Sequence, residues 1–214
     1  MKIIKPYYEI LSDIDGIKLL KQIEKAARTC YKSEDKIAED GSSARKLVAA
    51  LIKSGHEAMI EHSQLSVKFI CDRGVSHELV RHRLFSFAQE SQRYCNYGKG
   101  KFGAEITVIE PCFWVNDDDH SKIAYDLWYE VCKNAEKMYF KLLNYGATPQ
   151  EARSVLPNST KTEIVVTGNL REWRNFFKLR VDNAVHPQMR ELTIPLLKEL
   201  KERIPIIFDD INPN

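Results

Sequence analysis

Three arginines, one histidine and two serines lie within the fourteen residues from Arg81 to Tyr94. Guanidinium groups bind phosphate oxygens through paired, charge-assisted hydrogen bonds, and serine hydroxyls add shorter and more directional ones. Phe85, Phe87 and Tyr94 lie between these polar groups and offer flat apolar faces. The segment therefore predicts a site for an anionic ligand that contains a ring, such as a nucleotide or a flavin. A solvated basic patch is the alternative that residue types alone leave open.

Length and composition limit the class of protein. The chain has 214 residues, of which 43% are hydrophobic and 29% charged, and its net charge is +2. It can bury a core, and we expect a single domain over residues 1–214. A net charge this small argues against a surface devoted to nucleic acid. Because no stretch is patterned as a membrane span or a signal peptide, we expect no membrane contact and a cytoplasmic location.

The five cysteines are odd in number and none is spaced as C-x-x-C, so the sequence suggests neither a disulfide scaffold nor a zinc ribbon. A metal hydrolase built on His56, Glu57 and His62 is one alternative function. Its spacing is poor, because the zinc helix motif needs the second histidine four residues after the first, where this chain has Ile60. We therefore expect no metal site.

Hydrophobic periodicity predicts the elements that position the basic segment. Upstream, the expected elements are a strand over residues 2–10, helices over 17–30 and 43–54, and a strand over 65–70. A short helix over residues 75–84 would then deliver Arg81, His82 and Arg83 at its C-terminal end. Residues 86–93 are expected to form a loop.

The second half of the chain predicts further helices and strands. They are a strand over residues 105–109, a long helix over 119–145, a capped helix that begins at Pro149, a strand over 160–166 and a helix that begins after Asn169. In the long helix, one apolar stripe indicates a structural helix, and it consists of Ile123, Leu127, Val131, Met138 and Leu142. In the helix after Asn169, Arg171 and Asn175 share a face, because they are four residues apart.

The ordered residues of the basic segment match a known pattern. Arg81, His82, Arg83, Ser86, Ser91 and Arg93 fit R-H-R-x-x-S-x-x-x-x-S-x-R, which resembles the signature of the flavin-dependent thymidylate synthases. Three further elements resemble this family: G-H-E at residues 55–57, A-R-S-V-L-P at residues 152–157, and the spacing of Asn169, Arg171, Asn175 and Arg180. The resemblance covers about the middle and C-terminal two thirds of the chain.

This resemblance implies a methyltransferase that converts dUMP to dTMP. Methylenetetrahydrofolate would donate the carbon, and FAD would pass on a hydride from NADPH. The fold that we expect is α+β, in which helices cover a curved, mostly antiparallel sheet. The family resemblance adds a homotetramer whose active sites are shared between subunits.

The resemblance also assigns roles to residues of this chain. The expected FAD-binding residues are Arg81, His82, Arg83, Gln89, Asn169, Arg171 and Asn175. The expected dUMP-binding residues are Glu78, Arg81, Gln89, Glu90, Ser91, Gln92, Arg93, Arg153 and Arg180. Arg180 would lie against the uracil, where a fixed cation can stabilise charge that develops on the ring, and is the expected catalytic residue. His56 would lie near the folate.

Some residues depart from the family pattern or suggest other chemistry. Glu78 stands where some relatives have glutamine, and an ionised carboxylate there would repel phosphate. Ala58 replaces a hydroxyl residue that can bond the flavin, a contact that Ser63 could supply. Ser91 is assigned to binding, because the segment offers no base to activate a nucleophile. Cys112 is assigned as a structural thiol.

A nucleic-acid-binding module is the second alternative function. In it, the arginines of the basic segment with Lys99 and Lys101 would follow phosphates, while the aromatic residues stack on bases. This alternative predicts steeply salt-dependent binding to single strands and no bound flavin.

Overall fold

The computed structural model describes residues 1–98, 103, 105–114 and 116–213. The chain forms two compact units. Unit 1 comprises Met1–Tyr7, Phe69–Arg81 and Ala88–Ile164, and unit 2 comprises Tyr8–Lys68, His82–Phe87 and Val165–Asn214. The expectation of a single domain stays a prediction.

A four-stranded sheet contains residues of both units. Its strands, in spatial order, are β2 (Tyr7–Ile10), β3 (Gln64–Asp72), β6 (Lys161–Asn169) and β4 (Ser86–Gln89). Ser66 hydrogen-bonds Thr167 through their hydroxyls at 2.8 Å, whereas the Arg73 N–H donates to the Asn158 carbonyl at 2.8 Å. Residue numbers therefore decrease along β6 in the direction in which they increase along β3, so these two strands are antiparallel. The expected α+β class with an antiparallel sheet is confirmed.

The N-terminal strand expected over residues 2–10 is two strands. Residues Lys2–Ile4 form β1, which pairs in parallel with β5 (Thr107–Ile109), whereas β2 belongs to the four-stranded sheet. Pro6 lies between β1 and β2, and proline has no N–H to donate to a strand ladder. The expectation of one continuous strand was wrong for this reason.

The predicted helix over residues 75–84 begins and ends earlier. The Asp72 side chain accepts a hydrogen bond from the Val75 N–H at 2.9 Å and so caps α3 (Arg73–Leu79). Arg81, His82 and Arg83 therefore follow this helix in a turn. The expected loop over residues 86–93 was also wrong in its first half, because Ser86–Gln89 forms β4.

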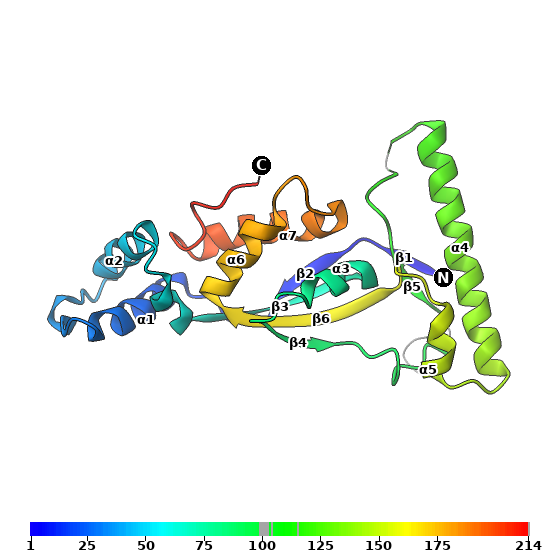
Figure 1. Cartoon of the computed structure of the whole chain (residues 1–214), viewed down its shortest axis with the longest axis horizontal. Coiled ribbons are helices and arrows are strands. Elements are labelled where there is room, and N and C mark those ends of the chain that lie inside the picture. Colours follow the sequence, from blue (N-terminus) through cyan, green and yellow to red (C-terminus); the bar gives the residue numbers. More distant parts are fainter. Residues whose placement is uncertain (99–102, 104, 115, 214) are drawn as a thin grey trace. The chain divides into compact units, whose positions relative to one another are not determined.

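Unit 1 has its own hydrophobic core. α4 (Asp119–Asn144) lies beside α5 (Pro149–Ala152), which continues into a 3-10 turn, η4 (Arg153–Val155) (Figure 1). The buried residues of this core are Tyr97, Ile106, Val108, Cys132, Tyr139 and Ala152. The Met1 amino group pairs with Glu105 and Glu136 at 3.3 and 3.1 Å.

The long helix α4 was predicted correctly, but the first half of its apolar stripe faces away from the described core. Ile123, Leu127 and Val131 are 60%, 65% and 64% exposed. Met138 and Leu142, in the second half of the stripe, are half-buried, and Leu142 packs on the core of unit 1. Periodicity shows that a helix has an apolar face but not what covers that face.

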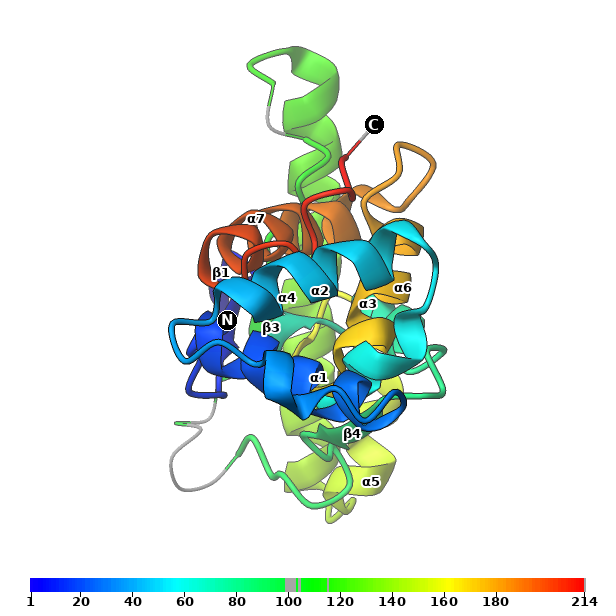
Figure 2. The ribbon, with the colours of Figure 1, turned by 90° about the vertical axis from the view of Figure 1, so that its left-hand side faces the viewer.

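Unit 2 contains two pairs of packed helices. α1 (Gly16–Thr29) and α2 (Ser42–Lys53) lie side by side (Figure 2), and the short η1 (Glu34–Lys36) connects them. The 3-10 segment η2 (Glu57–His62) contacts both α1 and α6 (Leu170–Arg180), and α6 packs on α7 (Pro187–Arg203). The aromatic core of this unit includes Phe85, Trp173, Phe176, Phe177 and Phe208.

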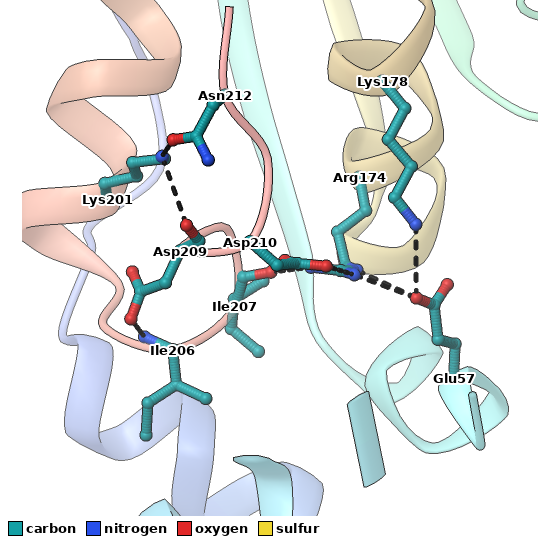
Figure 3. Close-up of polar contacts among 9 residues, drawn as sticks. All are labelled: Glu57, Arg174, Lys178, Lys201, Ile206, Ile207, Asp209, Asp210 and Asn212. Atoms are coloured by element: carbon teal, nitrogen blue, oxygen red, sulfur yellow. Dashed lines mark hydrogen bonds and ion pairs between the residues drawn. The ribbon is translucent and has the colours of Figure 1, made fainter. Parts of the chain in front are cut away.

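A buried arginine joins three segments of unit 2 (Figure 3). The Arg174 side chain is only 1% exposed, and its Nε and Nη2 donate to Glu57 of η2 at 3.1 and 3.0 Å. Its Nη1 and Nη2 also donate to Asp210 at 2.6 and 2.8 Å, and Nη1 donates to the Ile207 carbonyl. A buried charge is costly unless it is paired and hydrogen-bonded, and here all three donor nitrogens have partners.

We expect Arg174→Ala to lower the free energy of unfolding by about 2 kcal/mol. Breaking a buried ion pair leaves the partner charges uncompensated, and the value is reduced because Asp210 is half exposed. Arg174→Lys should lower the free energy of unfolding by less, because it keeps the positive charge and loses only the forked geometry of the guanidinium. Urea unfolding measures both, with Lys178→Ala as the control, because Lys178 lies 3.6 Å from Glu57 and is half exposed. An Arg174→Ala effect no larger than that of the control would contradict this role.

Candidate active site

A cleft of about 620 Å³ lies in unit 2 beside the N-terminus of α6. Its lining residues are Glu57, Glu61, Leu84, Asn169, Arg171, Glu172, Asn175 and Lys178. Three of the predicted FAD-binding residues, Asn169, Arg171 and Asn175, are therefore brought together in one cleft. Its volume falls in the range of ordinary small-molecule sites.

The N-terminus of α6 forms one wall of this cleft. Asn169 is the N-cap, and its side-chain oxygen accepts a hydrogen bond from the Glu172 N–H at 2.8 Å, as predicted. Other N–H groups of the first turn have no partner within the helix, and with the helix dipole they favour an anion. Arg171 and Asn175, one turn apart, both reach the cleft, which confirms that they share a face.

The charges of the cleft include both signs. Arg171 pairs with Glu61 at 2.6 Å, and both side chains are about half exposed, so this pair can open to admit a ligand. Burial raises the pKa of the Glu172 carboxyl above its ordinary value, and the Asn175 amide opposes this shift weakly. The donor set of helix N-terminus, guanidinium and amides thus fits a phosphate-bearing cofactor.

His82 and Arg180 form a second cluster in unit 2. The Arg180 Nε donates to the His82 Nε2 at 2.9 Å, and the His82 Nδ1 lies 3.7 Å from the Glu172 carboxylate. Burial lowers the pKa of His82 to about 4, and the charge of Arg180 acts in the same direction. The imidazole is therefore neutral at pH 7, and its contact with Glu172 is not an ion pair.

The predicted residues Gln89 to Arg93 at the end of the basic segment lie in unit 1. Gln89 donates to the Ser76 and Thr162 hydroxyls at 2.9 and 3.2 Å. Glu90 accepts hydrogen bonds from the Tyr97 hydroxyl and the Lys161 ammonium, both at 2.9 Å. Burial, with the nearby charge of Glu90, raises the pKa of Tyr97, so that its hydroxyl remains a donor. Gln89 and Glu90 thus fix the start of the segment that follows β4.

Ser91 and Arg93 lie in the turn after this anchor. The Ser91 hydroxyl accepts a hydrogen bond from the Arg93 N–H at 3.3 Å, and the Arg93 guanidinium lies 5.2 Å from the centre of the Tyr94 ring. The Arg93 side chain is exposed. Gln92, also predicted, has a buried side-chain nitrogen without a hydrogen-bond partner in the described residues.

The remaining predicted residues are distributed between the two units. Arg81, Arg153 and the half-buried Glu78 are in unit 1, and the exposed Arg83 is in unit 2. Most of the expected dUMP residues therefore belong to unit 1 and most of the expected FAD residues to unit 2. Among the expected dUMP residues, only Arg180 is in unit 2. Among the expected FAD residues, Arg81 and Gln89 are in unit 1.

His56 lies apart from the cleft of about 620 Å³. It lines a separate, mostly apolar cavity of about 350 Å³ in unit 2, together with residues of α1 and α2 such as Ala27 and Leu47. Ala58 lines the same cavity, so this departure from the family pattern does not alter the cleft itself. The Ser63 hydroxyl is buried without a hydrogen-bond partner in the described residues, and its carbonyl accepts the Leu170 N–H at the start of α6.

Five lining residues of the cleft were not among the predicted site residues: Glu57, Glu61, Leu84, Glu172 and Lys178. Glu57 was noted only in the G-H-E element and in the alternative metal site, and Glu172 only as part of a helix start. The helical spacing from Arg171 and Asn175 could have indicated Lys178, because positions three or four residues apart share a face. No local pattern indicates Glu61, which η2 brings to α6.

The alternative functions find little support in the described part of the chain. No group of three or more His, Cys, Asp or Glu side chains in that part is arranged to hold a metal ion. Lys99 and Lys101, which the alternative of a nucleic-acid-binding module requires, lie outside the described residues. Among the described helices, none has the length and hydropathy needed to cross a membrane.

Comparisons with known proteins agree with the sequence motifs. The family model described as "Thymidylate synthase complementing protein" matches residues 17–206. A flavin-dependent thymidylate synthase of Corynebacterium aurimucosum is 35% identical over 202 residues, which cover 89% of this chain and 79% of that protein. One of Pyrococcus furiosus is 32% identical over 182 residues, which cover 85% and 69%.

A solved structure shares the fold. It is that of a UMP/dUMP methylase, PolB, from Streptomyces cacaoi, crystallised with 5-Br dUMP. The TM-score is 0.78 at 24% sequence identity, and the alignment covers 98% of this chain and 96% of that one. This similarity supports the fold.

The chain belongs to the flavin-dependent thymidylate synthase family. It is therefore an enzyme of the methyltransferase class, and the resemblance found in the sequence is confirmed.

We expect Gly168→Ala, next to the N-cap of α6, to destabilise the protein by about 2 kcal/mol through overpacking. A Cβ at this position would lie 2.1 Å from Cδ1 of Phe85, whose buried ring packs on Trp173 with 4.7 Å between centroids. Thermal unfolding measures the effect. The cost should shrink in a Phe85→Leu background, where the side chain is smaller, and an unchanged cost there would show that this contact is not its source.

Proposed function

We propose that this enzyme converts dUMP to dTMP, with methylenetetrahydrofolate as carbon donor, NADPH as reductant and FAD as the bound cofactor. One structural observation supports the proposal most directly. The cleft at the N-terminus of α6 collects Asn169, Arg171 and Asn175 around donors that suit a phosphate. Family membership supplies the reaction class.

FAD would lie in this cleft. When bound, it supplies the capacity to accept a hydride from NADPH and to deliver it to the one-carbon unit. Asn169, Arg171 and Asn175 would hold its polar groups. Of the basic segment, Arg81, Arg83 and Gln89 would take part in binding, and His82 would help to order the site. The buried hydroxyl of Ser63 beside α6, which has no hydrogen-bond partner among the described residues, is a further donor close to this wall.

dUMP would be held by the residues after β4 and by two arginines from elsewhere. Ser91, Arg93 and Arg153 would bind its phosphate, because exposed guanidinium groups can turn to form paired bonds. Glu78, Arg81, Gln89, Glu90 and Gln92 complete this proposed set. Arg180 would lie against the pyrimidine and stabilise negative charge as C5 becomes nucleophilic. His56 would contact the folate from its own cavity.

The reaction is tested by release of tritium from dUMP labelled at C5. Purified protein is incubated with FAD, NADPH and methylenetetrahydrofolate, and dTMP is measured in the same samples. Release that depends on FAD and accompanies dTMP would support the proposal. Folded, flavin-loaded protein that releases no tritium would refute it. Salt-dependent binding of single-stranded nucleic acid without flavin would favour the alternative module.

We expect Arg180→Ala to lower kcat at least tenfold with little change in FAD binding, because its proposed partner is the pyrimidine. Tritium release measures turnover, and flavin absorbance after gel filtration measures binding. Arg203→Ala is the matched control, since Arg203 is an arginine of the same unit that pairs only with Glu199 among the contacts described for it. Loss of flavin in proportion to activity would contradict the role of Arg180.

We also propose a cytoplasmic homotetramer with active sites shared between subunits. The exposed stripe of Ile123, Leu127 and Val131 on α4 supports self-association, because three apolar side chains at spacings of four residues form a continuous face. A second copy of the chain could bury this face. Such an assembly would also allow site residues of two subunits to form one active site.

Leu127→Glu is expected to shift the enzyme toward smaller assemblies, because a charge in an apolar interface must be desolvated. Light scattering during gel filtration measures the mass. Lys137→Glu, at another exposed position of α4, is the control and should leave the mass unchanged. If sites are shared, turnover should fall together with the mass. An unchanged mass for Leu127→Glu would exclude this face as an interface.

A further inference from the structure

Three residues on one face of α6 contact the imidazole of His82. Glu172, Phe176 and Arg180 are spaced by four residues and so lie along one face of the helix. The Glu172 Oε1 is 3.7 Å from the His82 Nδ1, the Phe176 ring meets the imidazole edge-on at 5.0 Å, and the Arg180 Nε is 2.9 Å from the His82 Nε2.

The direction of the hydrogen bond fixes the proton of His82. A guanidinium only donates, so the His82 Nε2 must be unprotonated to accept from Arg180. The single proton of the neutral ring then sits on Nδ1, on the side of the Glu172 carboxylate. The lowered pKa of His82 agrees with a neutral ring. The separation of 3.7 Å between the His82 Nδ1 and the Glu172 Oε1 is longer than a hydrogen bond, so the carboxylate acts on this N–H through its negative charge and not as a direct acceptor.

Burial keeps these groups in place. His82 is 7% exposed, Glu172 is 5% exposed and Phe176 is fully buried, so none of these three side chains can turn freely into solvent. Arginine has a long and flexible side chain, and an ordered partner reduces the number of its conformations. The Arg180 backbone carbonyl accepts a hydrogen bond from the Thr193 hydroxyl at 2.8 Å, which fixes the main chain from which this side chain extends. The guanidinium itself is oriented by its bond to His82.

The same carboxylate also faces the cleft. Glu172 lines the cleft of about 620 Å³, and its Oε2 lies 3.4 Å from the Asn175 amide nitrogen. One oxygen of Glu172 is thus directed toward the proposed flavin site, and the other is directed toward His82. A buried carboxylate in an anion-binding cleft would weaken binding, so its presence there calls for a role.

We propose that Glu172 is a positioning residue, which holds the Arg180 guanidinium in place through the Nδ1–H tautomer of His82. This inference rests on the proposed function, because it takes Arg180 as the group that acts on the pyrimidine. It assigns His82 a task besides the expected contact with the cofactor. It also assigns a role to Glu172, which the sequence motifs do not.

The first test is a double-mutant cycle on the FAD-loaded enzyme. Glu172→Ala is expected to lower kcat about tenfold with less than a twofold change in the KM for dUMP, since the fault is in orientation. If Glu172 acts through His82, adding Glu172→Ala to His82→Ala should cost nothing further. Losses that multiply to about a hundredfold would show independent action and overturn the proposal.

Conservative replacement provides a second readout. Glu172→Gln keeps a side-chain oxygen beside the His82 Nδ1–H, whose dipole favours this tautomer, and it should recover part of the turnover lost in Glu172→Ala. Glu199→Gln is the matched control, because Glu199 is a carboxylate of unit 2 that accepts from the Tyr8 hydroxyl outside the cleft. It should retain wild-type kcat. Equal losses in Glu172→Gln and Glu172→Ala would count against positioning through this oxygen.

The tautomer is measured without relying on activity or on a variant that folds poorly. Nitrogen-15 NMR of labelled histidine in the unaltered protein at pH 7 reports which ring nitrogen bears the proton, and His82 is one of only six histidines. Its signals are identified by their loss in His82→Ala. A proton on Nδ1 alone is expected, and a proton on Nε2 would overturn the inference. This result stands even if the tritium assay refutes the proposed function, so the two failures can be told apart.

Discussion

The buried charge of Arg174 is the interaction on which the arrangement of unit 2 depends. A guanidinium that is 1% exposed must be neutralised where it lies, and only Glu57 and Asp210 provide carboxylates bonded to it among the described residues. These partners come from η2 and from the segment after α7 (Figure 3). The position of α6 is therefore tied to two parts of the chain that are far apart in sequence.

With its position fixed, α6 can present different residues on different sides. Arg171, Asn175 and Lys178 line the cleft, whereas Glu172, Phe176 and Arg180 contact His82. Trp173 and Phe177 pack in the aromatic core together with Phe85 and Phe208. One helix thus supplies the donors of the proposed cofactor site and the proposed catalytic arginine. Their relative geometry is set by the rigid helical backbone, which holds side chains better than a loop does.

The basic segment contributes residues to both units. Arg81 belongs to unit 1, while His82 begins the part of the segment that belongs to unit 2. Gln89 hydrogen-bonds Ser76 and Thr162, and Glu90 hydrogen-bonds Tyr97 and Lys161. These bonds fix the chain on either side of the end of β4. Exposed arginines such as Arg83 and Arg93 remain able to turn toward an anionic ligand.

The sequence by itself determined the family, the antiparallel α+β class, the N-cap of α6 and the shared face of Arg171 and Asn175. These depend on residue order, periodicity and capping, which are local. Tertiary structure alone decided the split of the N-terminal strand between two sheets, the outward-facing half of the stripe on α4 and the pairing of Glu61 with Arg171. It also decided that Arg180 meets His82, 98 residues away in sequence. Such contacts follow from which surfaces pack together, and no local pattern encodes them.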